Sequence, residues 1–467
     1  MATEILRASP RRTLVLILTV FVLRGVLAIA IIPPWQHPDE PQHFANVHIL
    51  ARQELRPLVA RAGQINLSER IDLDLEQRIL WSMSTHGWWR HYGEPEPNSF
   101  PEDFTGVNRH IWRVEDPPRA YYVLGAAGLA LTSLDSLLAQ YYLLRWMALA
   151  LAVPTVVCVW AGSRRLFGVH VAAGATLLTA LHPQFVLMST AVNPDILVYL
   201  CGAVVWWQAA RLLTGGSAGV SMALMAFATL IGVLTKRAGV PLVLMLFLVP
   251  AVALRFGRPG TFRVVGPSVS VLAGGLALVG LTAAFWSGDG VDWLTDYWGH
   301  LTTYPLVSLN QWFPPSVIDI HERWAYFQRF TQELFDSAWL MAGWLRYPAP
   351  PGWLLIIRLL TVGAVAGCVI GSRRPGMVQW RTGLALAGAL VLAQVISIYG
   401  GLFMRDLGAQ GRFLFPVIGP FMALFWVGIH SWWPQRVWPL VGAGLLSVMF
   451  ALDVVGWLGV LVPAYVR

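Results

Sequence analysis

The sequence predicts an all-α polytopic membrane protein, and three observations lead to this fold class. Of its 467 residues, 56% are hydrophobic and only 12% are charged, and the mean hydropathy is +0.58. Apolar runs also recur that are long enough to cross about 30 Å of hydrocarbon. The net charge is +8, but the arginines form short clusters between apolar runs and no single basic face, so no nucleic-acid partner is expected.

Clusters of arginine orient the predicted helices, because cytoplasmic loops are enriched in Lys and Arg. The first apolar run, Leu14–Ile32, follows such a cluster and is longer than the core of a typical signal peptide, so it is expected to remain as an anchor. Placing every cluster inside gives about eleven spans with a cytoplasmic N-terminus. They are expected at 13–32, 141–161, 168–188, 194–213, 219–235, 238–254, 264–286, 353–371, 382–403, 413–430 and 437–460.

Two large loops, 33–140 and 287–352, are expected on the outer side of a single membrane domain that comprises residues 1–467. Both loops are rich in Trp and Pro, and Trp is typical of the membrane interface. Apolar positions from Phe44 to Ala51 recur at helical spacing, which predicts an amphipathic helix along the membrane surface. The run Tyr121–Ser133 is too short for a full span and is expected to be a partly inserted or surface helix.

Ionisable and polar residues gather at the outer ends of the predicted helices. They are Asp39, Glu40 and His43 in PPWQHPDEPQHF, Asp116 in EDPPRAYY, Asn193 and Asp195 in VNPDIL, Lys236 and Arg237 in LTKRAGVP, and Arg405 and Arg412 in MRDLGAQGRFLFP. Each has an ordinary alternative as a helix cap, a first-turn acid, a turn or a snorkelling cation. Their combination favours a functional site, because ionised groups at membrane depth are costly unless they are paired or used.

Acids and cations on one face fit the transfer of a sugar from a polyprenyl phosphate to an acceptor hydroxyl. A carboxylate can take the proton of the acceptor, and Lys or Arg can neutralise the departing phosphate. A divalent metal (Mg, Mn or Ca) could serve the same purpose, with Asp39, Glu40, His43 and Asp195 as candidate ligands. The spacing of these residues matches no zinc signature.

Four stretches, PPWQHPDEPQHF, VNPDILVYL, LTKRAGVPL and GAQGRFLFP, resemble a bacterial membrane-protein family that is known only as a domain of unknown function. An acidic pair directly after the first helix also resembles the polytopic glycosyltransferases of the GT-C fold, such as protein mannosyltransferases and oligosaccharyltransferases. The resemblance extends from about residue 30 to 420 and is more specific for the family than for any reaction.

The resemblance implies roles for individual residues. It makes Asp39 the catalytic base, Glu40 its partner for sugar or metal, and Asp195 the acid of the second external loop, which often contacts metal or substrate. Lys236 corresponds to a basic position that follows a helix, and Arg412 to a basic position that faces the lipid phosphate. DPPRAYY resembles the HPPLYY stretch of these enzymes but has Asp116 in place of His, so a histidine role does not transfer.

The resemblance also implies a location and a donor. The protein is expected in the bacterial plasma membrane, with its active site on the outer face, a polyprenyl-phosphate sugar as donor, and a glycan, lipid or protein as acceptor. No nucleotide cofactor is expected, because the sequence shows no soluble nucleotide-binding βα unit.

Three alternatives stay open at this point. An O-antigen ligase or polymerase also uses outer Arg and His, but its main loop is expected late in the chain. A flippase or transporter of lipid-linked sugars would show inverted repeats and polar groups in mid-membrane. A scaffold without activity would keep the fold but would not need the outer charges.

Overall fold

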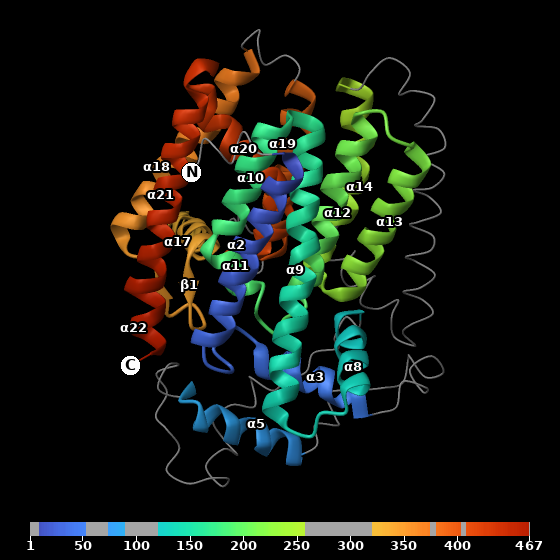
Figure 1. The fold of residues 1–467 in the computed structure, drawn as a ribbon, viewed down its shortest axis with the longest axis vertical. Coiled ribbons are helices and arrows are strands. Elements are labelled where there is room, and N and C mark those ends of the chain that lie inside the picture. Colours follow the sequence, from blue (N-terminus) through green and yellow to red (C-terminus); the bar gives the residue numbers. More distant parts are fainter. Residues whose placement is uncertain are drawn as a thin grey trace.

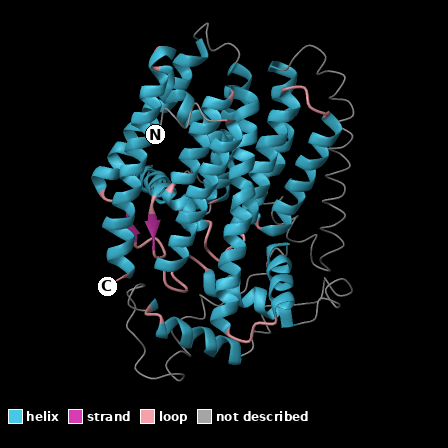
Figure 2. Cartoon of the chain, viewed as in Figure 1, coloured by secondary structure: helices cyan, strands magenta, loops and turns pink. Residues whose placement is uncertain are grey.

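The computed structural model describes residues 9–52, 73–88, 120–256, 320–373, 380–402 and 408–466. Helices make up nearly all of this part of the chain, as expected (Figure 2). The described strands are β1 (Met341–Ala342) and β2 (Tyr347–Pro348), which pair antiparallel.

Among the described residues, eight helical segments are long and apolar enough to cross a membrane, and most of them run along the long axis of the molecule (Figure 1). Each corresponds to one of the predicted spans. They are α2 (Pro10–Ile31), α9 (Leu137–Phe167), α12 (Asp195–Leu213), α13 (Ala218–Thr235), α18 (Pro351–Arg373), α19 (Arg381–Gly401), η5 with α20 (Gly411–Val417 and Ile418–Ser431), and Gln435–Tyr465, which comprises η6 (Gln435–Val437), α21 (Trp438–Gly456), η7 (Trp457–Leu461) and α22 (Val462–Tyr465).

Three predicted spans differ from this group. The span at 238–254 corresponds to η2 (Arg237–Gly239) and α14 (Pro241–Phe256), and the one at 264–286 lies outside the described residues. The span at 168–188 is divided into α10 (Val169–Leu181) and α11 (Pro183–Met188). The break lies at His182, because a residue before proline is pushed out of the helical region.

The helices of the first large loop lie together at one end of the bundle (Figure 1). They are α3 (Glu40–Arg52), α5 (Leu73–Thr85) and α8 (Ala120–Thr132). With 13 residues, α8 is about 20 Å long and shorter than the hydrocarbon core. The prediction that 44–51 lies along a surface is wrong in one respect: α3 buries almost every side chain from Glu40 to Leu50.

The second large loop contributes α17 (Ile320–Trp339) and the β1–β2 hairpin. At the tip of the hairpin, Trp344 has a left-handed backbone, with φ of 55°. Its indole Nε1 donates a hydrogen bond of 3.1 Å to the carbonyl oxygen of Trp35. The hairpin therefore joins the second loop to the turn that precedes α3.

A buried ion pair joins the first and the last membrane helices. Arg24 of α2 pairs with Asp453 of α21 and also donates to the carbonyl oxygen of Ala180 in α10. Both charged side chains are at most 10% exposed. Because an unpaired charge at this depth would be costly, the pair fixes how the three helices pack.

The single variant Arg24→Met is expected to be much less stable than a variant that removes both charges. The single change leaves Asp453 buried without its partner, which costs about 3 kcal/mol or more. Arg24→Met with Asp453→Leu removes that unpaired charge and should recover most of the melting temperature, measured in detergent micelles. Arg329→Met is the control, since its pair with Glu333 is exposed and worth about 0–1 kcal/mol. Equal losses in the single and double variants would contradict this account.

Candidate active site

The first predicted acid, Asp39, lies in a strained turn. It follows Pro38 directly before α3, and its backbone φ is 64°. A left-handed conformation is uncommon for a residue other than glycine and persists only where the surroundings hold it. The strain is an observation that favours a functional role for Asp39.

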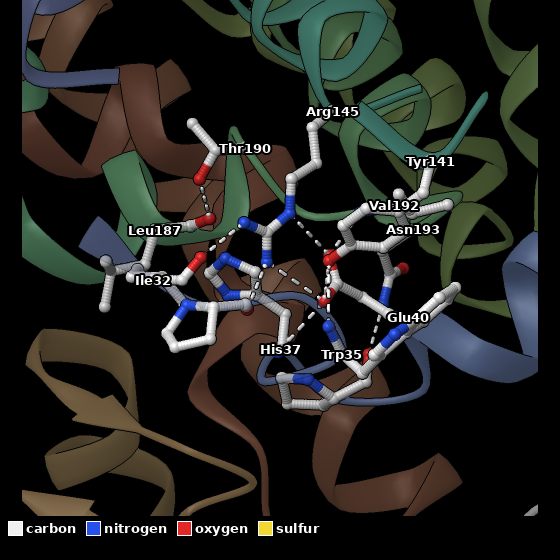
Figure 3. Close-up of polar contacts among 12 residues, drawn as sticks. Ile32, Trp35, His37, Glu40, Tyr141, Arg145, Leu187, Thr190, Val192 and Asn193 are labelled. Atoms are coloured by element: carbon white, nitrogen blue, oxygen red, sulfur yellow. Dashed lines mark hydrogen bonds and ion pairs between the residues drawn. The ribbon is translucent and has the colours of Figure 1, made fainter. Parts of the chain in front are cut away.

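The next residue, Glu40, is enclosed by donors from other parts of the chain (Figure 3). Its Oε1 accepts from Val192 N at 3.0 Å and from Arg145 Nε at 3.3 Å. Its Oε2 accepts from the Tyr141 hydroxyl at 2.7 Å, from His37 N at 3.2 Å and from Arg145 Nη2 at 3.2 Å. Both carboxylate oxygens are therefore fully used within the protein.

Arg145 of α9 completes this arrangement. Besides Glu40, its guanidinium donates to the carbonyl oxygens of Ile32 at 2.7 Å and Pro33 at 3.1 Å, at the end of α2. The side chains of Glu40 and Arg145 are both 0% exposed. Burial raises the pKa of Glu40, but Arg145 and the hydrogen bonds outweigh it and leave the pKa below its usual value. The expected role of Glu40 in catalysis or metal binding does not fit an enclosed, fully paired carboxylate.

Asn193 connects the two turns that carry the acids. Its Nδ2 donates to the carbonyl oxygen of Pro38 at 3.3 Å, and its Oδ1 accepts from the backbone N of Asp195 at 2.9 Å. The side chain is buried, with 0% exposure. Asn193 therefore holds the turns in place, which differs from the substrate contact expected from the sequence.

Four charged side chains from distant parts of the sequence meet where α3 and α12 begin and α13 ends. Arg412 Nη2 lies 2.6 Å from Asp39 Oδ2, and Arg412 Nε lies 3.4 Å from Asp195 Oδ2. Lys236 Nζ lies 2.7 Å from Asp195 Oδ1. We call these four residues the charge cluster; it alternates acid and base and carries no net charge.

The members of the charge cluster differ in exposure. The side chains of Asp39 and Lys236 are 33% and 23% exposed, whereas those of Arg412 and Asp195 are 6% and 1% exposed. Burial raises the pKa of Asp39, but the cations around it, Arg412 foremost, outweigh burial and lower it to about 2. Asp39 is thus ionised at neutral pH and is the more exposed of the two acids in the charge cluster.

The backbone around Arg412 is held by α17. Gly411 N donates to the Ser337 hydroxyl at 2.8 Å, and a Cβ on Gly411 would lie 1.9 Å from the backbone N of Ala338. Only glycine allows this close approach. The ring of Phe413 then lies beside both cations, 5.4 Å from the Arg412 guanidinium carbon and 5.6 Å from Lys236 Nζ.

His43 lies one helical turn after Asp39, beside the charge cluster. Its Nδ1 is 2.8 Å from the hydroxyl of Tyr122 in α8, and its Nε2 is buried without a hydrogen-bond partner among the described residues. Burial lowers the pKa of His43 to about 3, so the ring is neutral. Its free ring nitrogen can meet a hydroxyl or a phosphate oxygen.

Three predicted site residues cannot be placed. Asp116 and Arg405 lie outside the described residues, and of Arg237 only the backbone, in η2, is described. Sequence reasoning missed Arg145 and Tyr141, which hold Glu40. The sequence did contain a signal for Arg145, which is a lone arginine inside an apolar run. A charged residue within a membrane segment usually has a functional role.

The predicted metal ligands do not form one set. Within the described ranges, no three His, Cys, Asp or Glu side chains are placed to hold a metal ion. Glu40 faces Arg145, while Asp39 and Asp195 face Arg412. Asp39 and Asp195 are thus already bridged by a protein cation.

The fold and the site define a class: a helical membrane protein with charged residues at one end of its bundle. Crystal structures of the Archaeoglobus fulgidus oligosaccharyltransferase are similar to this chain. The form tethered with an acceptor peptide has a TM-score of 0.52 at 12% identity, covering 94% of this chain and 55% of that one. The apo form has a TM-score of 0.50 at 12% identity, covering 96% and 55%. The chain thus spans about half the length of the structures that it matches.

A family comparison adds to this likeness. The model of the family described as dolichyl-phosphate-mannose-protein mannosyltransferase matches residues 121–286. That range contains Arg145, Asp195 and Lys236. No curated protein matches the chain. The family model matches part of the chain, and the solved structures show its fold, which is that of the GT-C superfamily.

Variants of Glu40 and Arg145 are expected to separate stability from activity. Either Glu40→Met or Arg145→Met leaves one charge buried alone and should cost about 3–5 kcal/mol. The double variant should recover much of the melting temperature. Its turnover should remain low, because Tyr141, His37 N and Val192 N have lost their acceptor and the turns of both acids can shift. A Glu40→Met protein with wild-type stability but no turnover would contradict this account and indicate a catalytic role for Glu40.

His43→Gln is expected to weaken the pH dependence of thermal stability. Burial lowers the pKa of His43 to about 3 and that of His37 to about 4, below the roughly 6.5 of an unfolded histidine. The unfolded chain therefore binds protons that the folded chain does not, so stability is complete above about pH 6.5 and decreases as the pH falls.

Melting temperatures of the wild type and His43→Gln, taken from about pH 7.5 to about pH 5, test this prediction. Asp39 does not interfere, since its folded pKa of about 2 and its unfolded pKa of about 3.9 both lie below this window. An unchanged slope in the variant would contradict the prediction.

Proposed function

We propose that the protein transfers a sugar from a polyprenyl-phosphate donor to a hydroxyl of a cell-envelope glycan, lipid or protein. The observation that carries the proposal is the charge cluster, in which a reachable acid, Asp39, lies 2.6 Å from the guanidinium of Arg412. Glycosyl transfer from a lipid phosphate needs both a base and cations for the leaving phosphate. The GT-C fold and the mannosyltransferase family match support the same reaction class.

Asp39 acts as the base in this proposal. It takes the proton of the acceptor hydroxyl while the acceptor oxygen bonds to the anomeric carbon of the sugar. The bond from that carbon to the phosphate oxygen breaks, and polyprenyl phosphate departs with the electron pair. Arg412 and Lys236 neutralise the phosphate, Arg412 by a fork of N–H donors and Lys236 as a point charge.

Donor binding also makes Asp39 a better base. In the free site, Arg412 and its neighbours hold the pKa of Asp39 at about 2, which is low for proton abstraction. A phosphate that shares the donors of Arg412 weakens the pair with Asp39 and so raises the pKa of Asp39. The acid therefore becomes basic when the leaving group is in place.

The surroundings of the reaction follow from the arginine distribution and the resemblance to the bacterial family of unknown function. We place the protein in the bacterial plasma membrane, with the N-terminus cytoplasmic and the charge cluster at the outer face. A flippase is disfavoured, because its polar residues belong at mid-membrane, whereas the charge cluster lies where α12 begins and α13 ends.

Asp39→Asn is expected to reduce turnover by at least about 100-fold, the usual contribution of a general base. The assay uses the purified chain in lipid nanodiscs with a panel of polyprenyl-phosphate sugars and measures released polyprenyl phosphate. Asp135→Asn is the matched control, since Asp135 is an exposed acid just before α9. Full activity of a correctly folded Asp39→Asn protein would remove Asp39 as the base, and donor binding without release by the wild type would favour a flippase.

A further inference from the structure

We infer that Arg412 and Lys236 take the place of a divalent metal in this site, so that the proposed transfer runs on protein cations alone. The inference rests on the proposed function for its reaction, but its structural basis is independent. That basis is the position of the Arg412 guanidinium between the carboxylates of Asp39 and Asp195.

The near oxygens of the two acids are already occupied by one guanidinium. Arg412 contacts Asp39 Oδ2 through Nη2 at 2.6 Å and Asp195 Oδ2 through Nε at 3.4 Å. The other oxygen of Asp195 lies 2.7 Å from Lys236 Nζ. A metal shared by Asp39 and Asp195 would have to displace Arg412 from the space between them.

Burial makes that displacement unfavourable. The Asp195 side chain is 1% exposed and that of Arg412 is 6% exposed. Moving the guanidinium would leave a buried cation without its counter-ions, at a cost of several kcal/mol. A bound metal would need to compensate this loss with two carboxylates, because within the described ranges no third acid, His or Cys joins them.

The charge balance favours the same conclusion. Two acids and two bases make the charge cluster neutral before any substrate arrives. A divalent ion added to the charge cluster would leave it with two excess positive charges around the buried side chains of Arg412 and Asp195, and Ca²⁺, which takes about six to eight oxygen ligands, would find only two carboxylates there. A sugar phosphodiester brings one negative charge, which the existing cations can share.

Arg412 also keeps a donor that is not used. Its Nη1 is buried and has no hydrogen-bond partner within the part of the chain that the structure describes, and its Nε, which also has none, makes only the 3.4 Å ion-pair contact with Asp195. Buried donors are nearly always paired, so an unpaired one points to a ligand that completes it. An oxygen of the donor phosphate is the acceptor that this nitrogen fits.

Two readouts test the inference. The first needs no turnover: Mn²⁺ is titrated into the nanodisc-embedded wild type and the Asp39→Asn variant, and bound metal is measured by electron paramagnetic resonance. We expect no saturable binding that depends on Asp39. The second compares turnover of the wild type before and after treatment with EDTA, and we expect the rates to agree within about twofold, since the protein cations supply the electrostatic stabilisation.

Variants of the cation complete the test. Arg412→Ala should lose at least about 100-fold in turnover, and guanidinium added to the buffer should restore part of it, whereas Mg²⁺ or Mn²⁺ should not. Arg412→Lys serves if the alanine variant does not fold, because it keeps the charge but loses the bridge between the acids. Arg329→Ala, an exposed arginine of α17, is the control and should keep its activity.

The outcomes separate the inference from the proposed function. Metal binding that Asp39→Asn abolishes, or turnover that EDTA removes and a divalent ion restores, overturns the inference and leaves the transferase proposal intact. A wild type that turns over no donor in the panel counts against the transferase proposal, and the Mn²⁺ titration still decides whether the acids hold a metal.

Discussion

The buried pair of Glu40 and Arg145 is the interaction on which the site depends. It connects the start of α3 to α9 and to the end of α2, because Arg145 belongs to α9 and also donates hydrogen bonds to the carbonyl oxygens of Ile32 and Pro33. The Oε1 atom of Glu40 also accepts a hydrogen bond from the backbone N of Val192, next to the turn of Asn193. One carboxylate thus fixes both acid-bearing turns relative to the membrane helices.

Because of this anchoring, the neighbouring acids Glu40 and Asp39 have different surroundings. Glu40 points inward and is enclosed, so its charge serves the fold, whereas Asp39 turns toward Arg412 and stays one-third exposed. The left-handed backbone at Asp39 is what allows successive side chains to take such different directions. The strain in that turn costs of the order of 1–3 kcal/mol, which the contacts of Glu40 can offset.

The sequence could indicate the members of the site but not their pairing. Asp39, Asp195, Lys236 and Arg412 each lie at an end of a predicted helix, and topology alone places such ends on one side. The contacts of Glu40 could not be foreseen, because Arg145 is 105 residues away and lies within an apolar run. Likewise, hydropathy predicted one span over 168–188 because it does not register the break that Pro183 causes after His182. Eight predicted spans reappear as long helices, since their apolar length leaves few other structures in a bilayer.

The neutrality of the charge cluster has a consequence for how the proposed donor would bind. A strongly positive site would attract every anionic headgroup nearby, whereas paired charges attract little until a ligand satisfies donors that the pairs leave unused. Arg412 keeps such a donor at Nη1, and Asp39 and Lys236 remain partly exposed on either side of it. In the proposed reaction, a phosphate that reaches Arg412 exchanges one counter-ion for another, so its binding costs little desolvation of the guanidinium and releases Asp39 at the same time. In the proposed reaction, the ion pairs of the charge cluster thus make the capture of the leaving group and the activation of the base a single event.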